Sequence, residues 1–293
     1  MKKQFMAIGV IVASSCVAGF SQADTTDGGG GSKLPAGVKS EVLNSLKIAD
    51  IHLPTDNKPL TCRSLRFRTV DVQPGSHIDL HSHENRPAML GVLRGSATVY
   101  PYQHKPVTLH IGDSYKEYAN VHYAINDSAT DMLTMTTFDL LDDGSSCNGV
   151  TYPQNTPLLD KLKAEHVKYY VDAPKNGGME KSTPVYSHKV YDIRLPKQGA
   201  GLTDRIMRVR KVSLAKGIAL PQQDFSNRPT YLLVLDGSLD VMTPEHKELA
   251  PVGKSGTVDL VNVNEVTIRN HSATTPASYL VFELWDPKDA GTI

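Results

Sequence analysis

Residues 75–95 read GSHIDLHSHENRPAMLGVLRG, and the architecture of the whole chain can be worked out from this stretch. Its second part continues as ENRPAMLGVLRGSATV at 84–99 and has a counterpart 142 residues later, SNRPTYLLVLDGSLDV at 226–241. Another pair, LRFRTVDVQPG at 65–75 and MRVRKVSLAKG at 207–217, has the same offset. So many identities at one offset indicate an internal duplication. The two halves are therefore expected to share one fold.

Both repeats consist of short runs rich in Val, Leu, Thr and Tyr, separated by turn signals such as Pro74-Gly75 and Arg94-Gly95. Many short strands with turns about every ten residues predict an all-β protein of two jelly-roll barrels. Arginines alternate with apolar residues in the first run, as expected of a strand with two different faces. Two short helical connectors are expected, at 40–50 and at 156–170.

The first 23 residues have the layout of a secretory signal peptide. Lys2 and Lys3 precede an apolar stretch that ends at Phe20, and small residues precede a cleavage point at Asp24. The apolar stretch is short for a membrane span. Three positions before Cys16 there is no aliphatic residue of the kind that usually precedes a lipidated cysteine. Lipidation of Cys16 is therefore disfavoured, but it is not excluded. The sequence thus predicts a periplasmic or secreted protein.

Signal cleavage would leave two cysteines, Cys62 and Cys147. An even pair in an exported protein predicts a disulfide, with two free thiols as the alternative. The bond would close a loop of 86 residues around the first repeat. A loop of that size would stabilise the fold by about 4 kcal/mol if the bond is unstrained.

The chain divides into a signal peptide and four further segments. We expect a flexible leader at 24–39, a first domain at 40–150, a linker with a helix at 151–185, and a second domain at 186–293. Lys plus Arg and Asp plus Glu are equal at 31 each, so nothing points to a nucleic-acid partner. After signal cleavage no membrane association is expected.

Three histidines in the first repeat predict a metal site. His81 and His83 are two residues apart, so on a strand both point to the same face. If that face lines the barrel interior, His122 from a neighbouring strand can converge with them. Imidazoles suit divalent transition metals, and we expect one ion of Fe, Zn, Mn, Ni or Cu.

These stretches resemble the two sequence motifs of the cupin superfamily, at matching positions over most of 62–145 and, through the repeat, about 204–285. The positions that match the first motif are Gly75, His81, His83 and Gly95. The positions that match the second motif are Gly112, His122 and Asn126. With the duplication, the chain resembles a bicupin. The resemblance implies two jelly-roll barrels and makes a homodimer an expectation.

The chain departs from the family pattern at the glutamate ligand, whose position holds Ala88. The resemblance therefore implies three histidine ligands without the glutamate. Glu84, Glu117 or His77 could replace the glutamate as a ligand, but each stands at the wrong place in the motif. We therefore rank each of them below a water molecule as the replacement ligand. A loaded site without the glutamate carries one more positive charge, which would favour anionic substrates.

The second repeat has lost every ligand position and is predicted to hold no metal. The residues at the places of His81, His83, Ala88 and His122 are Gln223, Phe225, Thr230 and Val266. Arg86 recurs as Arg228, so we interpret it as structural rather than as a substrate clamp. Residues that differ between the halves are better functional candidates. Tyr100, Tyr118 and Tyr123 are candidates for lining the pocket, and Tyr118 and Tyr123 for catalysis.

Two functional classes follow. The first is an exported metalloenzyme of the dioxygenase, lyase or isomerase type that acts on a small molecule. The second is a non-catalytic bicupin that binds a small ligand or has a structural role, with a relic metal site. Fold alone does not choose between them.

Overall fold

The computed structural model describes residues 34–51, 64–141, 156–165, 180–189, 204–244 and 251–288. The predicted signal peptide, Cys16, most of the leader, and both Cys62 and Cys147 lie outside the described residues. Within them, no helix is long and apolar enough to cross a membrane.

The first half is a jelly roll of two sheets, as the sequence predicts. Its larger sheet has the strand order β10-β2-β9-β4-β7, and its smaller sheet has the order β3-β8-β5-β6. The strands that begin and end within the first repeat are β2 (Ser64–Val72), β3 (His77–Ser82), β4 (Ala88–Arg94), β5 (Ala97–Pro101), β6 (Val107–Leu109), β7 (Ser114–Glu117), β8 (Val121–Asn126) and β9 (Leu133–Leu141).

The second half repeats this arrangement. One sheet has the order β1-β11-β17-β12-β15 and the other has the order β14-β13-β16. Its strands are β11 (Ile206–Leu214), β12 (Thr230–Asp236), β13 (Ser238–Met242), β14 (Val252–Gly253), β15 (Thr257–Asp259), β16 (Thr267–Asn270) and β17 (Ala277–Trp285). The all-β prediction of two cupin-type jelly rolls is therefore confirmed, with each half hydrogen-bonded as two separate sheets.

One detail shows how closely the halves agree. The amide of Asn126 donates hydrogen bonds to the carbonyls of Val72 and Asp131, at 3.1 and 2.8 Å. Asn270 donates in the same way to Leu214, at 3.3 Å, and to Thr275, at 2.8 Å. The motif asparagine thus ties the end of one strand to a turn in both copies, which is a structural role.

The two halves exchange strands. β1 (Val38–Lys47) precedes the first repeat but pairs antiparallel with β11 of the second half. β10 (Glu180–Lys189) begins within the predicted linker and pairs with β2 of the first half. The predicted helix at 40–50 was therefore wrong, apart from a 3-10 turn at Ile48–Asp50. Backbone pairing with a strand 159 to 176 residues away outweighs the local helical preference of this segment.

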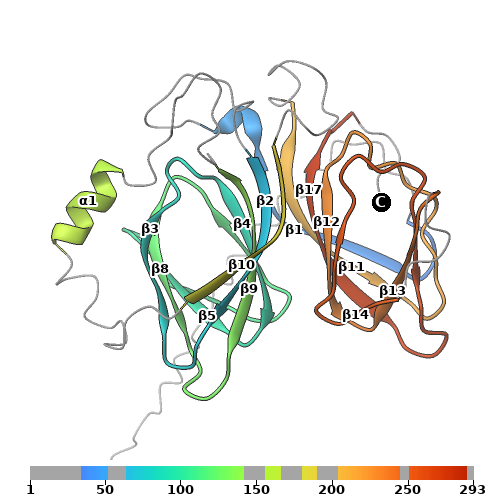
Figure 1. Cartoon of the computed structure of the whole chain (residues 1–293), viewed down its shortest axis with the longest axis horizontal. Helices are drawn as coiled ribbons and strands as arrows, with labels where there is room; N and C mark the ends of the chain where they lie inside the picture. The colour runs from blue at the N-terminus through green and yellow to red at the C-terminus, as the bar shows by residue number, and fades with distance from the viewer. Residues whose placement is uncertain are drawn as a thin grey trace, which may run out of the picture.

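The helix predicted at 156–170 is present as α1 (Pro157–Ala164). Thr156 caps it by accepting a hydrogen bond from the Leu159 amide at 3.3 Å, and Pro157 begins the first turn. Leu159 and Leu162 face the outside of the smaller sheet beside Leu80 and Tyr123. Figure 1 shows α1 at the outer edge of the first half, next to β3.

The larger sheets of the two halves pack against each other and form a shared core (Figure 1). Its centre is aromatic: the Phe67 ring stacks on Tyr231 at 5.2 Å and meets Phe282 edge-on at 5.2 Å. Phe138 packs on Tyr231 at 5.7 Å. Each such pair adds about 0.5–1.5 kcal/mol beyond the area it buries. The outward faces of β2 and β11 are thus apolar, and their arginines point into the barrels.

A close approach between the halves gives a first prediction. A methyl group added at Gly91 would lie 2.8 Å from the Phe282 ring and 2.9 Å from Leu280. Gly91→Ala should lower the free energy of unfolding by about 1–3 kcal/mol, because this packed contact has no room. Urea denaturation measures the change. Gly253→Ala is the control, since nothing lies within 4 Å of the added atom. Equal stability of the two variants would contradict the packing.

Candidate metal centre

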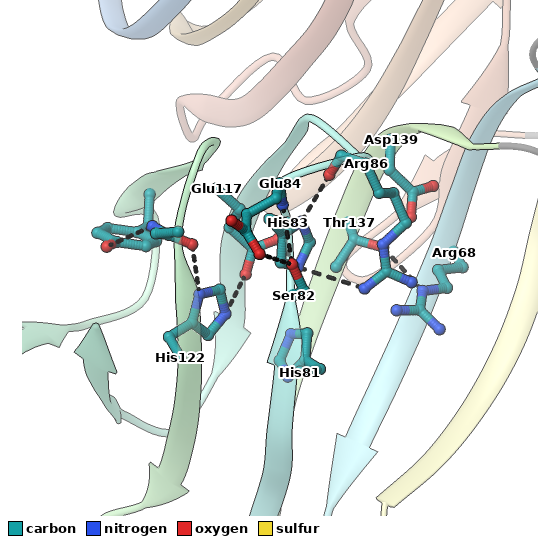
Figure 2. A network of polar contacts seen from close by, with 12 residues as sticks. Arg68, His81, Ser82, His83, Glu84, Arg86, Glu117, His122, Thr137 and Asp139 are labelled. Carbon is teal, nitrogen blue, oxygen red and sulfur yellow. Dashed lines mark hydrogen bonds and ion pairs between the residues drawn. The ribbon is translucent and has the colours of Figure 1, made fainter. Parts of the chain in front are cut away.

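Four side chains of the first half converge inside the barrel (Figure 2). They are His81 on β3, His83 directly after it, Glu117 at the end of β7 and His122 on β8. One ligand atom from each lies within 4.8 Å of the other three. The structure thus brings together the three histidines singled out by the sequence and adds a carboxylate.

The sheet register explains how the histidines meet. His81 stands directly opposite His122, with ring centroids 4.4 Å apart. Beyond the last residue of β3, the amide of His83 donates to the carbonyl of Asn120 at 2.8 Å, so the pairing continues. His83 therefore keeps the same face as His81, and its ring lies 5.0 Å from each of the other two.

Backbone carbonyls orient two of the rings. Nδ1 of His81 lies 2.7 Å from the carbonyl oxygen of Asp79, and Nδ1 of His83 lies 2.7 Å from that of Arg86. A carbonyl oxygen only accepts, so Nδ1 must carry the proton in both rings. Nε2 then presents its lone pair to the cluster. This is the arrangement in which an outer partner holds a metal-binding imidazole in place.

The third ring is held by a side chain. Nδ1 of His122 donates to Oδ1 of Asn120 at 2.9 Å, and the Asn120 amide donates to the Tyr115 hydroxyl at 3.5 Å. Nε2 of His122 then points at Oε1 of Glu117, 3.2 Å away. All three histidines therefore offer the same nitrogen to a common point.

Glu117 completes the cluster from an unexpected strand. It pairs directly opposite Ala88, the position where the cupin pattern has its glutamate. Its Oε2 is buried, has no hydrogen-bond partner, and lies 3.6 Å from Nε2 of His83. The structure thus places Glu117, which the sequence analysis ranked below water, among the candidate ligands. The motif counts positions along one strand, whereas the sheet places a carboxylate from the neighbouring strand at the same spot.

Residues 68–138 match a family of known proteins described as the cupin domain. The first half is a cupin domain. No curated protein matches the sequence.

Solved structures are similar to this chain at low sequence identity. AerE from Microcystis aeruginosa is 12% identical, over 86% of this chain and 95% of that one, with a TM-score of 0.43. An oxalate decarboxylase from Lactobacillus farciminis, in a formate complex, is 12% identical over 87% of each chain, with a TM-score of 0.43. A salicylate 1,2-dioxygenase from Pseudaminobacter salicylatoxidans is 10% identical over 89% of this chain and 87% of that one, with a TM-score of 0.45.

Arginines of the cupin interior lie close to the cluster. Nη2 of Arg86 lies 3.3 Å from Nε2 of His83, the nitrogen that faces the cluster. Arg68 donates to the Thr137 hydroxyl at 2.9 Å, to the right of the histidines in Figure 2. The Arg86 guanidinium thus faces a candidate ligand, where the sequence suggested a purely structural contact with backbone carbonyls.

The tyrosine candidates lie elsewhere. Tyr123 stacks on Tyr100 at 4.7 Å and packs with α1, on the face of β8 opposite to His122. Tyr118 donates to the carbonyl of Asp50 at 3.1 Å and packs against the core between the halves. In the described part of the chain, the tyrosine ring that meets His122 is Tyr115, 6.2 Å away and edge-on. Tyr115 and Glu117 are two residues apart on β7, so their side chains point to the same face. This spacing was the sequence signal that could have identified Tyr115.

Burial controls the protonation of the cluster. Burial lowers the pKa of His81 well below its usual value, and the neighbouring His122 and Arg86 lower it further. Burial and then Arg86 lower the pKa of His83 in the same direction. Both rings are therefore neutral near pH 7, which is the state that binds a metal. Burial, followed by the charge of Glu117, raises the pKa of Tyr115 to about 12.

The second half shows what replaces the ligands. Gln223 and Val266 form an isolated bridge, just as His81 and His122 pair in the first half. Phe225 packs into the apolar core of this half. The positions that hold ligands in the cupin domain are thus filled by amide and apolar side chains.

The lowered histidine pKa values give a second prediction. Between the folded pKa and the unfolded value of about 6.5, the unfolded chain binds more protons. The metal-free protein should therefore lose stability as the pH falls below about 6.5. The buried His83 alone should contribute up to about 1.4 kcal/mol per pH unit. Urea unfolding from pH 7.5 to 5 tests this against the variant His81→Gln/His83→Gln, whose profile should be flatter. Parallel profiles would contradict it.

Proposed function

We propose that His81, His83, Glu117 and His122 hold one divalent transition-metal ion, and that the protein is a metalloenzyme acting on a small molecule. The observation that supports this most is the convergence of three Nε2 lone pairs and one carboxylate within 4.8 Å. The donor set fits such an ion, because imidazole and carboxylate together suit Fe, Mn, Ni, Cu or Zn. A buried carboxylate oxygen without a hydrogen-bond partner also fits a site built to receive a cation.

The ion would supply Lewis acidity or activation of water or oxygen, which are the chemistries of dioxygenases, lyases and isomerases. Three imidazoles and one carboxylate leave coordination positions free for a substrate. The chain itself contributes neutral side chains at His81 and His83 and fixed orientations of all three histidine rings. The reaction class within this group is left to experiment.

Arg86 supports an anionic substrate. Its guanidinium lies 3.3 Å from the same His83 lone pair that a metal would take. With the lone pair occupied, Arg86 must find another acceptor beside the site, and a carboxylate or enolate of the substrate is suited to this. Glu117 supplies the negative charge that is absent at Ala88, so a missing glutamate does not contribute to a preference for anions.

The alternative is a bicupin that binds a small ligand, or has a structural role, without catalysis. The placement of Tyr118 and Tyr123 favours it, since neither proposed catalytic tyrosine lies in the histidine cluster. Tyr115 does lie near His122, but its raised pKa makes it a poor proton acceptor near neutral pH. A measurement of metal content distinguishes a metal-binding centre from a relic site that no longer binds metal.

Export stays a prediction from residues 1–23, and so does the Cys62–Cys147 disulfide. A homodimer likewise stays a prediction. Each can be read from one purified sample: the mass of the N-terminus, the count of free thiols and the molar mass in solution.

The third prediction concerns metal content. Protein prepared without chelators from the periplasm should carry about one transition-metal ion per chain by mass spectrometry. His81→Ala/His83→Ala should carry none, and Glu117→Gln should bind at least tenfold more weakly, because a ligand is lost. Glu84→Gln is the matched control, since Glu84 hydrogen-bonds Ser82 and Thr156 rather than the cluster. If the wild-type protein stays metal-free after an attempt to reload it, the histidine cluster is a relic that no longer binds metal.

The fourth prediction concerns the support of His122. Asn120→Ala removes the oxygen that fixes this ring at 2.9 Å. Metal affinity should fall about 10–100-fold while the fold is retained, because the ligand is no longer oriented. Competition with a chromophoric chelator measures the affinity. An unchanged affinity would mean that Asn120 does not position the ring.

A further inference from the structure

The carboxylate candidate Glu117 stands at the end of a short edge strand. β7 has four residues and is the last strand of its sheet, where it is hydrogen-bonded to β4. Two residues after Glu117, Ala119 adopts a left-handed backbone with a φ of 53°, and the chain turns into β8. A strand end at the edge of a sheet is less constrained than the centre of that sheet. The position of the Glu117 carboxylate therefore depends on what holds this end of β7.

The residue after Glu117 reaches out of the first barrel. Because neighbouring side chains along a strand point to opposite faces, Glu117 points into the barrel and Tyr118 points away from it. The Tyr118 ring packs against the core that the two halves share. Its hydroxyl donates a hydrogen bond to the backbone carbonyl of Asp50 at 3.1 Å. Tyr118 thus connects the strand that carries the carboxylate to the segment before the first repeat.

That segment is anchored in the second half. β1 pairs with β11 of the second half from end to end, and it also lies against β7 of the first half. Directly after β1, the amide of the buried Ile48 donates to the carbonyl of Arg205 at 2.9 Å. The 3-10 turn is closed by the amide of Ile51, which donates to the carbonyl of Ile48 at 3.1 Å. The Asp50 carbonyl is therefore held by the second half.

The second repeat provides an internal comparison. Its strands β12 and β15 pair in the same register as β4 and β7 of the first repeat. In this register, Leu260 stands at the place of Glu117. The next residue, Val261, stands at the place of Tyr118 and packs against the same shared core. The core therefore requires an apolar side chain at this place, whereas the hydroxyl is present only in the repeat that has the carboxylate.

We propose that Tyr118 is a positioning residue for Glu117, and that the second half provides its support through the Asp50 carbonyl. The hydrogen bond fixes the end of β7 and thereby holds the carboxylate 3.2 Å from Nε2 of His122 and 3.6 Å from that of His83. A ligand that is already in place loses less freedom when an ion binds. The inference rests on the proposed metal centre, because it assigns a support to one of its ligands.

The metal affinity of the purified protein tests this role. Tyr118→Phe removes the hydroxyl and keeps the ring that packs against the core. Chelator-treated protein is titrated with Co²⁺ in competition with a chromophoric chelator. The affinity should fall about tenfold, because the carboxylate is no longer held in position. Tyr100→Phe is the matched control and should leave the affinity unchanged, since Tyr100 stacks on Tyr123 on the outer face of the smaller sheet.

A double-variant comparison shows whether the hydroxyl acts through the carboxylate. If it does, Tyr118→Phe weakens Co²⁺ binding in the wild-type background and causes no further loss in the Glu117→Ala background. The visible d–d absorption of bound Co²⁺ depends on ligand geometry, so it should change in Tyr118→Phe and stay unchanged in Tyr100→Phe. An equal loss of affinity in both backgrounds would overturn the proposal, because it would indicate a general effect on the fold.

The same titrations distinguish this proposal from that of the metal centre. Wild-type protein that binds no Co²⁺, or Glu117→Ala with wild-type affinity, would overturn the ligand set and the role of Tyr118 together. Binding that depends on Glu117 but is the same in Tyr118→Phe as in wild type would overturn only the role of Tyr118.

Discussion

The alternation of side chains along β2 and β11 is the constraint on which both halves depend. One face of each strand supplies apolar side chains, such as Phe67 and Met207, to the core between the two large sheets. Because successive residues point to opposite faces, the same strands must direct Arg66 and Arg208 into the barrels. Packing of the halves thus places positive charge inside each jelly roll. Each interior has to compensate for it.

The two halves meet this requirement differently. The first half retains Asp139 and Glu117, and Glu117 also joins the three histidines. In the second half, Glu283 pairs with three arginines, while Leu260 and Phe225 have replaced polar groups with apolar volume. After the duplication, one barrel kept donors for a cation. The other kept buried arginines that pair with Glu283.

Strand pairing also explains the altered ligand set. The distance along the chain from His83 to the family's glutamate ends at Ala88, so the motif is incomplete along this strand. Across the sheet, Ala88 faces Glu117, and the carboxylate reaches the same space from the adjacent strand. A ligand can therefore change strands without changing the site. The exchange of β1 and β10 between the halves has a related cause. The edge of a sheet presents unpaired backbone N–H and C=O groups, and a strand from the other half can pair with them.

The sequence by itself determined the duplication, the all-β fold, the helix at Pro157 and the three histidines, because these depend on local periodicity, turn residues and spacing within one strand. Only the tertiary structure decided that residues 38–47 form a strand, because their partner in β11 is distant in sequence. It also decided that Glu117 joins the cluster and that Tyr123 turns away from it, because register between strands sets both. The ion-pair cluster around Glu283 likewise becomes visible only when residues from two strands, β11 and β17, and a loop meet in one buried space.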